Sequence, residues 1–523
     1  MNKSTILSIL LLLVLPAGIN AQNASKEISE AINRYGQTIY YINNYYLDSV
    51  NVQKISDDAL REVVSKLDPH SVYIPAEDVL KANEQIVGEF EGIGIEFAII
   101  LDTLTIQAPV SGGPSERVGI RAGDKIVAVD GENIAGISIK NEDVYKYLRG
   151  PKGTRVDLTI KRKGEASPMA FTVTRDKIPL NSLDAAYEIE PGILYLKLGR
   201  FAISSNEEIV EAFKKYGKTP KGVILDLRGN SGGALVSSLK LANQFLEREQ
   251  LILYTEGRAM PAMKEFADGR GIYKSGKLAI LIDENSASAS EIVSGAVQDW
   301  DRGVIIGRRS FGKGLVQQVL PLQGGAELRL TVARYHTPSG RVIQTPYVAG
   351  DAENYYREYY KRFSNGESFS TENINFPDSL KYKTLKEGRT VYGGGGIMPD
   401  IFVPLDTTYY TNFYAQMLRR GVVLDFVNDL GDRLRADLSK QYKDFDSFGK
   451  GYNISKELFS ELLSYAKERG VDLVESEVAI SRSEIEIYMK ALLARIIFDN
   501  DAYFKVVNSR NDPALKEAIK QLR

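Results

Sequence analysis

The spacing of apolar and polar residues predicts different kinds of secondary structure along the chain. Near the N-terminus, apolar residues between Ser25 and Leu47 recur three and four positions apart, which predicts an amphipathic helix; a second helix is expected from Ser56 to Leu67. We expect the apolar face of the first helix to pack in the protein's own core, with a docking or dimer surface as the alternative. Three further tyrosines widen that face: Tyr40, Tyr41 and Tyr45.

Residues 86–177 show short apolar runs separated by turn signals, a pattern typical of strands. We expect a strand from Glu91 to Ile100 and a helix from Lys140 to Leu148. The order of these elements and the Gly-Ile-Gly-Ile loop resemble a PDZ domain. The resemblance implies that backbone N–H groups of the loop face a peptide's terminal carboxylate and that the strand edge pairs with the peptide. A structural barrel with an unused edge is the alternative. The expected peptide-binding residues are Gly92, Ile93, Gly94 and Ile95.

Strands and helices alternate in the middle of the chain, which predicts an α/β core with helices packed on a mostly parallel sheet. The expected elements are a strand at Gly192–Leu198, a helix at Ser205–Lys215, a strand at Gly222–Arg228 and a helix at Leu235–Leu246.

A turn of small residues, Asn285–Ser290, joins a predicted strand at Leu278–Ile282 to a predicted helix. A serine at such a corner is exposed, and the first N–H groups of the helix, which lack intrahelical partners, point at whatever lies over it. This geometry suits a nucleophile with an oxyanion hole. The residues alone do not choose between the alternating serines of the turn, Ser286, Ser288 and Ser290.

A lysine in a glycine-flanked turn follows, and a predicted strand begins directly after it at Leu315. Lys313 in its neutral form can act as a base, and Gln317, four residues on, falls on the same face of an extended chain. Residues 307–313 also fit part of a phosphate-binding P-loop, which would indicate a nucleotide hydrolase. That alternative lacks the required Ser or Thr, because Gly314 stands there, and the next segment predicts a strand where a P-loop opens a helix.

The stretches SASASEI and RSFGKGLVQ together resemble the C-terminal processing (tail-specific) serine peptidase family. The resemblance implies that Ser288 is the nucleophile, Lys313 the general base and Gln317 its assistant. DLRGNSGG resembles the family's glycine turn, which implies an oxyanion hole formed by the N–H groups of Gly232 or Gly233 and of Ala289.

The resemblance also implies the fold class and the function. The expected fold is multidomain α/β and α+β: a ClpP/crotonase-like α/β peptidase core, an inserted-style PDZ domain, and helical N- and C-terminal regions. The expected activity is that of an endopeptidase that engages the C-terminal tails of protein or peptide substrates and cuts them with a Ser-Lys dyad, without metal or cofactor. A non-catalytic PDZ-containing scaffold that only captures peptides is the alternative.

Composition narrows the remaining classes. The formal net charge is −2 and 43% of the residues are hydrophobic, so nothing suggests a nucleic-acid partner. The chain has no cysteine, which excludes disulfides, thiol catalysis and cysteine metal sites. Its two histidines, His70 and His336, are too few for a histidine-rich zinc site, and a structural role is expected for each.

The first residues predict export. Lys3 precedes an apolar run, Ile6–Leu15, that is too short to span a bilayer, and a cut after Ala21 is expected, with an uncleaved membrane anchor as the alternative. The mature protein is expected to be periplasmic or extracellular, and a homo-oligomer stays open. The expected division is a signal peptide at 1–21, an N-terminal helical region at 22–85, a PDZ-like domain at 86–177, a peptidase core at 178–404 with a surface insertion at 351–386, and a helical packing or assembly region at 405–523.

Overall fold

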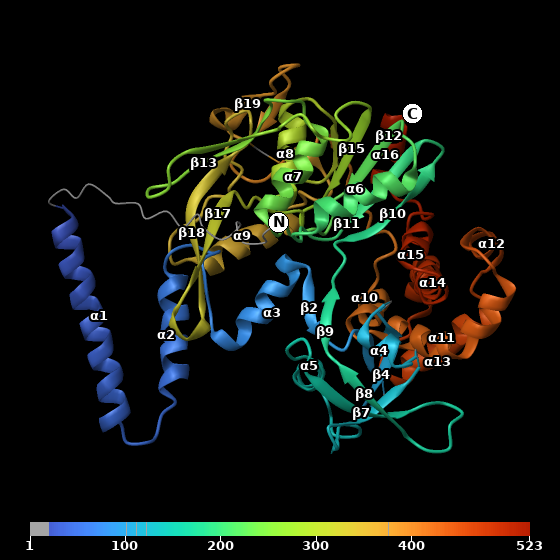
Figure 1. Ribbon diagram of the computed structural model, residues 1–523. Coiled ribbons are helices and arrows are strands. Elements are labelled where there is room, and N and C mark those ends of the chain that lie inside the picture. Colours follow the sequence, from blue (N-terminus) through green and yellow to red (C-terminus); the bar gives the residue numbers. More distant parts are fainter. Residues whose placement is uncertain (1–19, 101, 111, 122, 375) are drawn as a thin grey trace, which may run out of the picture.

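A computed structural model describes residues 20–523 except 101, 111, 122 and 375 (Figure 1). The predicted signal peptide therefore lies almost entirely outside the described residues. Among the helices that are described, none is both long and apolar enough to cross a membrane.

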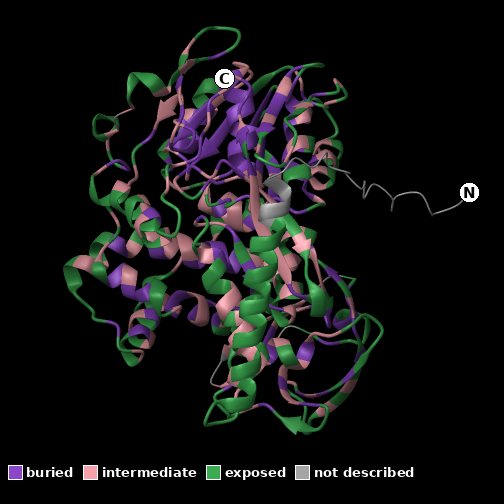
Figure 2. Ribbon diagram, turned by 90° about the vertical axis from the view of Figure 1, so that its left-hand side faces the viewer, coloured by how far each residue is buried: buried purple, intermediate pink, exposed green. Residues whose placement is uncertain are grey.

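Two N-terminal helices, α1 (Asn20–Tyr45) and α2 (Val52–Ser65), form an arm beside the body of the protein (Figure 1). The hydroxyls of Tyr35 on α1 and Ser56 on α2 are 3.0 Å apart. Along α1, Tyr40 and Tyr41 are 58% and 57% exposed, and Figure 2 shows most of the helix as exposed. The expectation that this face packs in the core is wrong, because α1 reaches past the body and has α2 as its neighbour.

A six-stranded sheet forms the centre of the α/β core, in the order β10-β11-β12-β15-β16-β21. The β10–β11 pair is antiparallel, and the other four pairs are parallel. The alternation of strands and helices in the sequence predicted such a mostly parallel sheet. The strands are β10 (Leu183–Glu190), β11 (Ile193–Leu198), β12 (Gly222–Asp226), β15 (Lys277–Ile282), β16 (Val304–Gly307) and β21 (Ile401–Phe402).

Helices cover both faces of this sheet. Leu194 and Leu196 pack with one set of helices, whereas Tyr195, one position between them, packs on the opposite face. Each fully buried aliphatic side chain contributes about 1.5–3 kcal/mol, so the two apolar layers hold the sheet rigidly. Helices α6 (Ser205–Tyr216), α7 (Leu235–Phe245) and α8 (Ala289–Asp299) lie on the first face, and α16 (Pro513–Leu522) lies on the second.

A second sheet, in which every strand pair is antiparallel, includes the strand that follows the loop containing Lys313. Its order is β1-β18-β13-β14, and β17 pairs with β18. The strands are β1 (Val72–Ile74), β13 (Leu251–Glu256), β14 (Met263–Phe266), β17 (Leu315–Pro321) and β18 (Glu327–His336). The insertion contains a helix that was not predicted, α9 (Ala352–Ser364), and the small strands β19 (Lys381–Lys383) and β20 (Thr390–Tyr392) follow it.

The PDZ-like block lies below the core in Figure 1 and has its own apolar core. Helix α3 (Ala76–Val87) and the β2–β9 pair connect it to the core. Its sheet has the order β3-β4-β5-β7-β8, so β3 is an edge strand. The elements are β2 (Glu89–Gly92), β3 (Ile95–Ile100), β4 (Thr103–Pro109), α4 (Pro114–Arg117), β5 (Lys125–Val129), β6 (Glu132–Asn133), α5 (Asn141–Leu148), β7 (Arg155–Lys161), β8 (Met169–Thr174) and β9 (Asp176–Pro179).

The C-terminal region is helical, as expected, with a separate apolar core. The helices are α10 (Asn412–Arg419), α11 (Val422–Gln441), α12 (Phe445–Gly451), α13 (Lys456–Glu468), α14 (Glu475–Ile497) and α15 (Asn500–Val507), before α16.

Candidate active site

Ser288 occupies the corner between β15 and α8, where the sequence predicted it. Its backbone has φ 54° and ψ −111°, a conformation that residues other than glycine rarely adopt and that is typical of strained functional turns. The neighbouring serines Ser286, Ser290 and Ser294 are fully buried, and their hydroxyls donate to backbone carbonyls at 2.8 Å. Ser288 is only half-buried, so its hydroxyl is the accessible one of the four.

Lys313 lies in the loop between β16 and β17, and its side chain is partly buried. Its Nζ donates to Gln317 Oε1 at 3.0 Å. Burial lowers the pKa of Lys313 because desolvation disfavours the ammonium. The nearby carboxylates of Asp68 and Glu291 favour the ammonium and partly oppose this shift. The segment after Lys313 is the strand β17, so the P-loop alternative is wrong.

The amide of Gln317 has a fixed orientation. Its Nε2 donates to the carbonyl oxygen of His70 at 2.5 Å. Because a carbonyl only accepts, the amide nitrogen must face His70, which leaves Oε1 to accept from Lys313. Both the ammonium and the neutral amine can donate to this oxygen, so the lysine keeps the contact when it loses a proton, and its lone pair is directed elsewhere.

Glu291, on the first turn of α8, joins the serine turn to the lysine loop. Its Oε2 accepts from the backbone N–H of Ser288 at 2.7 Å and from that of Lys313 at 2.9 Å. Its Oε1 accepts from Ser310 Oγ at 2.6 Å and from the N–H of Gly312 at 2.7 Å. The side chain is fully buried, and burial raises the pKa of Glu291 to about 7 although these donors favour the carboxylate.

The glycine turn after β12 lies directly against the serine turn. A Cβ on Gly232 would stand 2.9 Å from Ser288 Cβ and 3.1 Å from Ala289 N, so only glycine permits this approach. The N–H of Gly232 donates to Asn230 Oδ1 at 2.9 Å. Those of Gly233 and Ala289 donate to no described residue, so of the two glycine alternatives Gly233 has the unoccupied donor.

The two histidines lie in different surroundings. The imidazole of His70 is 3.2 Å from the Tyr355 hydroxyl, and burial, with the charge of Lys313, lowers the pKa of His70 to about 4. His336 stacks on Tyr254 and lies 3.2 Å from Glu256 Oε2, at the far end of β18. Sequence reasoning gave both only a structural role and missed the contact of His70 with Gln317.

Sequence reasoning also missed Glu291, although a known sequence pattern marks this residue. A serine followed three residues later by glutamate at a helix start is the capping-box pattern, and Ser288 and Glu291 have this spacing. A further residue, Tyr335 on β18, donates from its hydroxyl to Lys313 O at 2.9 Å and lies 3.3 Å from Ser288 O. No local pattern marks that contact.

The predicted peptide-binding loop lies between β2 and β3. The Ile93 side chain is buried, and its carbonyl accepts from both the N–H and the hydroxyl of Ser115. Gly94 has φ +72°, and its carbonyl accepts from Val110 N at 2.9 Å. Gly92 pairs with β9, and Ile95 begins the edge strand β3. The loop therefore leads into a strand with an unpaired edge.

Comparisons with known proteins identify the class. The model of peptidase family S41 matches residues 192–354, a PDZ domain model matches residues 105–162, and a family of unknown function (DUF8443) matches residues 413–499. The carboxy-terminal-processing protease of Bartonella bacilliformis is 37% identical over 62% of this chain and 74% of its own length. A "Probable CtpA-like serine protease" of Staphylococcus aureus is 31% identical over 69% and 72%.

Solved structures give matches of the same kind. The photosystem II D1 C-terminal processing protease is 24% identical and covers 72% of this chain and 87% of its own, with a TM-score of 0.35. A PDZ domain of a carboxy-terminal protease from Vibrio cholerae, in complex with peptide, is 32% identical over 18% of this chain and 99% of its own, with a TM-score of 0.16. The sequence relatives show that this chain belongs to the carboxy-terminal-processing proteases of peptidase family S41. It is a serine peptidase with a PDZ domain, which removes the non-catalytic scaffold as an alternative.

Proposed function

We propose that the protein is an exported endopeptidase that cuts peptide bonds with a Ser288–Lys313 dyad. The observation that carries this proposal is the single carboxylate oxygen, Glu291 Oε2, that accepts from the backbone N–H groups of both residues. Two turns from different sheets are thereby held against each other. The resemblance of the turn sequences to the family's motifs supports the same residues.

In the proposed mechanism, neutral Lys313 takes the proton of the Ser288 hydroxyl as the oxygen attacks the scissile carbonyl. The developing oxyanion is stabilised by the N–H groups of Ala289 and of Gly233, or of Gly232 once it leaves Asn230. The lysine then protonates the leaving amine, and water hydrolyses the acyl-enzyme. A free lysine titrates at about 10.4 and is almost entirely protonated at neutral pH, so the site must favour the neutral amine. Burial acts in that direction, and Gln317, being neutral, adds no negative charge that would hold the ammonium.

Substrate tails are proposed to bind at the PDZ domain. An extended peptide would add to the edge of β3, with its carboxylate at the loop of Gly92, Ile93, Gly94 and Ile95. The peptide in the Vibrio cholerae PDZ complex supports this mode. The sheet order, with helices on both faces, supports a ClpP/crotonase-like core. The lysine and the short apolar run near the N-terminus support export to the periplasm or beyond.

The test of the proposal uses a fluorophosphonate probe and the full chain. The parent should be labelled at Ser288, and Ser288→Ala should lose both labelling and turnover, with its unfolding temperature unchanged because one half-exposed hydroxyl contributes little packing. Ser286→Ala serves as the matched control for the turn. Labelling of Ser288→Ala would contradict the assignment.

Tail recognition needs a separate measurement. A peptide substrate with a free C-terminal carboxylate should be cut faster than the same peptide with a C-terminal amide, because only the acid can accept from the loop N–H groups. Equal rates for the two peptides would mean that the loop does not capture a carboxylate.

A further inference from the structure

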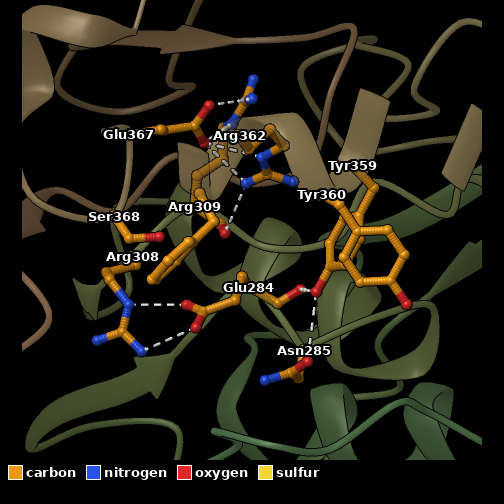
Figure 3. A pocket seen from close by; sticks show the side chains of 10 residues that line it. Glu284, Asn285, Arg308, Arg309, Tyr359, Tyr360, Arg362, Glu367 and Ser368 are labelled. Atoms are coloured by element: carbon orange, nitrogen blue, oxygen red, sulfur yellow. Dashed lines mark hydrogen bonds and ion pairs between the residues drawn. The ribbon is translucent and has the colours of Figure 1, made fainter. Parts of the chain in front are cut away.

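Helix α9, within the insertion at 351–386, lies against the surroundings of the active site. Tyr359 donates from its hydroxyl to Glu284 O at 3.2 Å, just after β15. Arg362 donates to the carbonyl oxygens of Arg309 and Ser310 at 3.0 Å, in the loop that leads to Lys313. Tyr359 and Arg362 line a cavity of about 240 Å³. Figure 3 shows both side chains at this cavity. The helix thus touches both turns that carry the dyad.

Tyr355 is the buried residue of this helix, only 4% exposed. Its hydroxyl lies 3.2 Å from His70 Nε2 and accepts from Gln344 Nε2 at 3.4 Å. Burial lowers the pKa of His70 to about 4, so the imidazole is neutral at neutral pH and its Nε2 can accept. Burial also raises the pKa of Tyr355, so the phenol keeps its proton and can donate a hydrogen bond to His70 Nε2 when the imidazole carries its proton on Nδ1.

Two chains of hydrogen bonds run from this hydroxyl back to Lys313. The first passes through His70. The carbonyl oxygen of His70 accepts from the amide of Gln317, and Gln317 Oε1 in turn accepts from Lys313 Nζ. The second passes through Gln344, whose Oε1 accepts from the N–H of Gly314 at 2.8 Å. The Tyr355 hydroxyl is therefore linked both to the side chain of Lys313 and to the backbone of the next residue, Gly314.

The segment that carries His70 has further anchors. Asp68 Oδ1 accepts from the N–H groups of His70 and Ser71 at 2.9 and 2.8 Å, and Thr331 Oγ1 donates to the same oxygen. Tyr356, next to Tyr355 on α9, donates to Pro69 O at 3.2 Å. The His70 carbonyl is thus fixed by backbone contacts on one side and by α9 on the other.

We propose that Tyr355 is a positioning residue for the base, and that α9 exists to hold Gln317 and Lys313 in register through His70. This inference rests on the proposed role of Lys313. Tyr355 is assigned no contact with substrate. Its hydroxyl keeps the Gln317 amide oxygen facing the amine, so that the lysine lone pair stays directed away from Gln317.

The test compares Tyr355→Phe with Tyr360→Phe, which removes the same hydroxyl from a tyrosine on the same helix that is 70% exposed. Tyr355→Phe keeps the ring that packs edge-on against His70 and Phe311. We expect its kcat to fall about tenfold with KM within twofold of the parent, because orientation of the base changes the chemical step and leaves substrate binding intact. Tyr360→Phe should match the parent. Equal kcat values for the two variants would overturn the proposal.

A double-mutant cycle tests the route through His70. His70→Ala should lower kcat about as much as Tyr355→Phe, and the double variant should be no worse than either single one. His70→Gln, whose amide oxygen can accept from the phenol, should recover most of the loss. Additive losses would mean that Tyr355 acts independently of His70 and would overturn the route. If Tyr355→Phe does not fold, as judged by its thermal unfolding, His70→Ala alone decides: parental kcat overturns the proposal and a reduced kcat supports it.

Ser288→Ala and Lys313→Ala are measured in the same assay, so that a failure of the proposed dyad can be distinguished from a failure of the inference about α9. If they keep turnover, the proposed dyad has failed. If they are inactive while Tyr355→Phe equals Tyr360→Phe, only the inference about α9 has failed.

Discussion

The corner that holds Ser288 and Lys313 differs from the loop Gly92–Ile95 in how far along the chain its contacts reach. At the corner, Gln317 contacts His70 across 247 positions, and Glu291 on α8 contacts Gly312 and Lys313 in the loop between β16 and β17. In the loop, the hydroxyl of Ser115 donates a hydrogen bond to the carbonyl oxygen of Ile93, which is only 22 positions away. One site is assembled by the whole fold and the other by its own domain.

The two sites also differ in what their geometry controls. At the corner, buried titratable groups face one another, so desolvation sets which of them carry charge. In the loop, the expected binding groups are backbone N–H donors, whose direction depends on glycine conformation. Changes of charge should therefore damage the corner most, whereas changes of backbone shape should damage the loop. Four predictions test this difference.

The largest effect is expected for Lys313→Arg. Arginine keeps the positive charge but cannot release its proton, so the proposed general base is lost, and turnover should fall by about 10³-fold or more, as in Lys313→Ala. Steady-state cleavage of a peptide substrate measures this. Lys361→Arg, on the exposed side of α9, is the matched control and should match the parent. Near-parental turnover by Lys313→Arg would mean that the lysine acts through charge alone.

The next effect is expected for Glu291→Gln. The amide nitrogen that replaces one oxygen would face N–H or O–H donors at Ser288, Ser310, Gly312 and Lys313, so the tie between the two turns must break on one side. We expect kcat to fall by about 10²-fold, together with a lower thermal unfolding temperature. Glu358→Gln, half-exposed on α9, is the control. Unchanged kcat would show that the tie is not needed for catalysis.

The pH dependence of stability follows from the same carboxylate. Burial raises the pKa of Glu291 to about 7 from its ordinary value of 4.5. Between these pH values the folded state holds a proton that the unfolded chain has released, so the free energy of unfolding falls as pH rises, by about 3 kcal/mol at ~1.36 kcal/mol per pKa unit. Over the same range the carboxylate that ties the turns forms, so activity should rise.

Urea unfolding of the parent and of Glu291→Gln at pH 5 and pH 8 measures this contribution. The difference between the two proteins in how the free energy of unfolding changes with pH cancels the contributions of the other titrating groups, including His70. The parent should lose more stability than the variant between the two pH values. An identical pH dependence in both proteins would mean that Glu291 does not titrate with a raised pKa.

Much of the fold could be predicted because its signals are local. The strands β11, β12 and β15 are mostly apolar, and the glycine and serine turns come shortly after β12 and β15. Helix α9 was missed although Tyr355 and Tyr359 are spaced for one helix face, since serine and charge dominate its surroundings. The apolar face of α1 was placed in the core because periodicity shows that a face exists and does not show what covers it.

The site was predictable to the extent that its residues lie in compact motifs. Ser288, Lys313 and Gln317 come from two short stretches, and the structure places both stretches on one carboxylate. The partners that fix Gln317 come from elsewhere: His70 lies 285 positions before Tyr355, and no spacing rule relates them. A buried site assembled from several elements leaves such contacts to tertiary packing alone.

The smallest effect is expected for Gly94→Val, and it tests the loop by shape. Gly94 has φ +72°, and a Cβ there would stand 2.8 Å from Ile178 Cδ1 and 3.2 Å from Pro114 Cδ, so valine must displace the buried Ile178 side chain or the loop. We expect kcat/KM to fall about tenfold for substrates with a free C-terminal tail and to stay parental for their amides. Gly112→Val is the matched control, because Gly112 has φ +69° but no atom within 4 Å of its Cβ, so it carries the backbone strain without the displacement. Equal losses in the two variants, or on the two kinds of substrate, would mean that strain in the domain and not the shape of the loop limits cleavage.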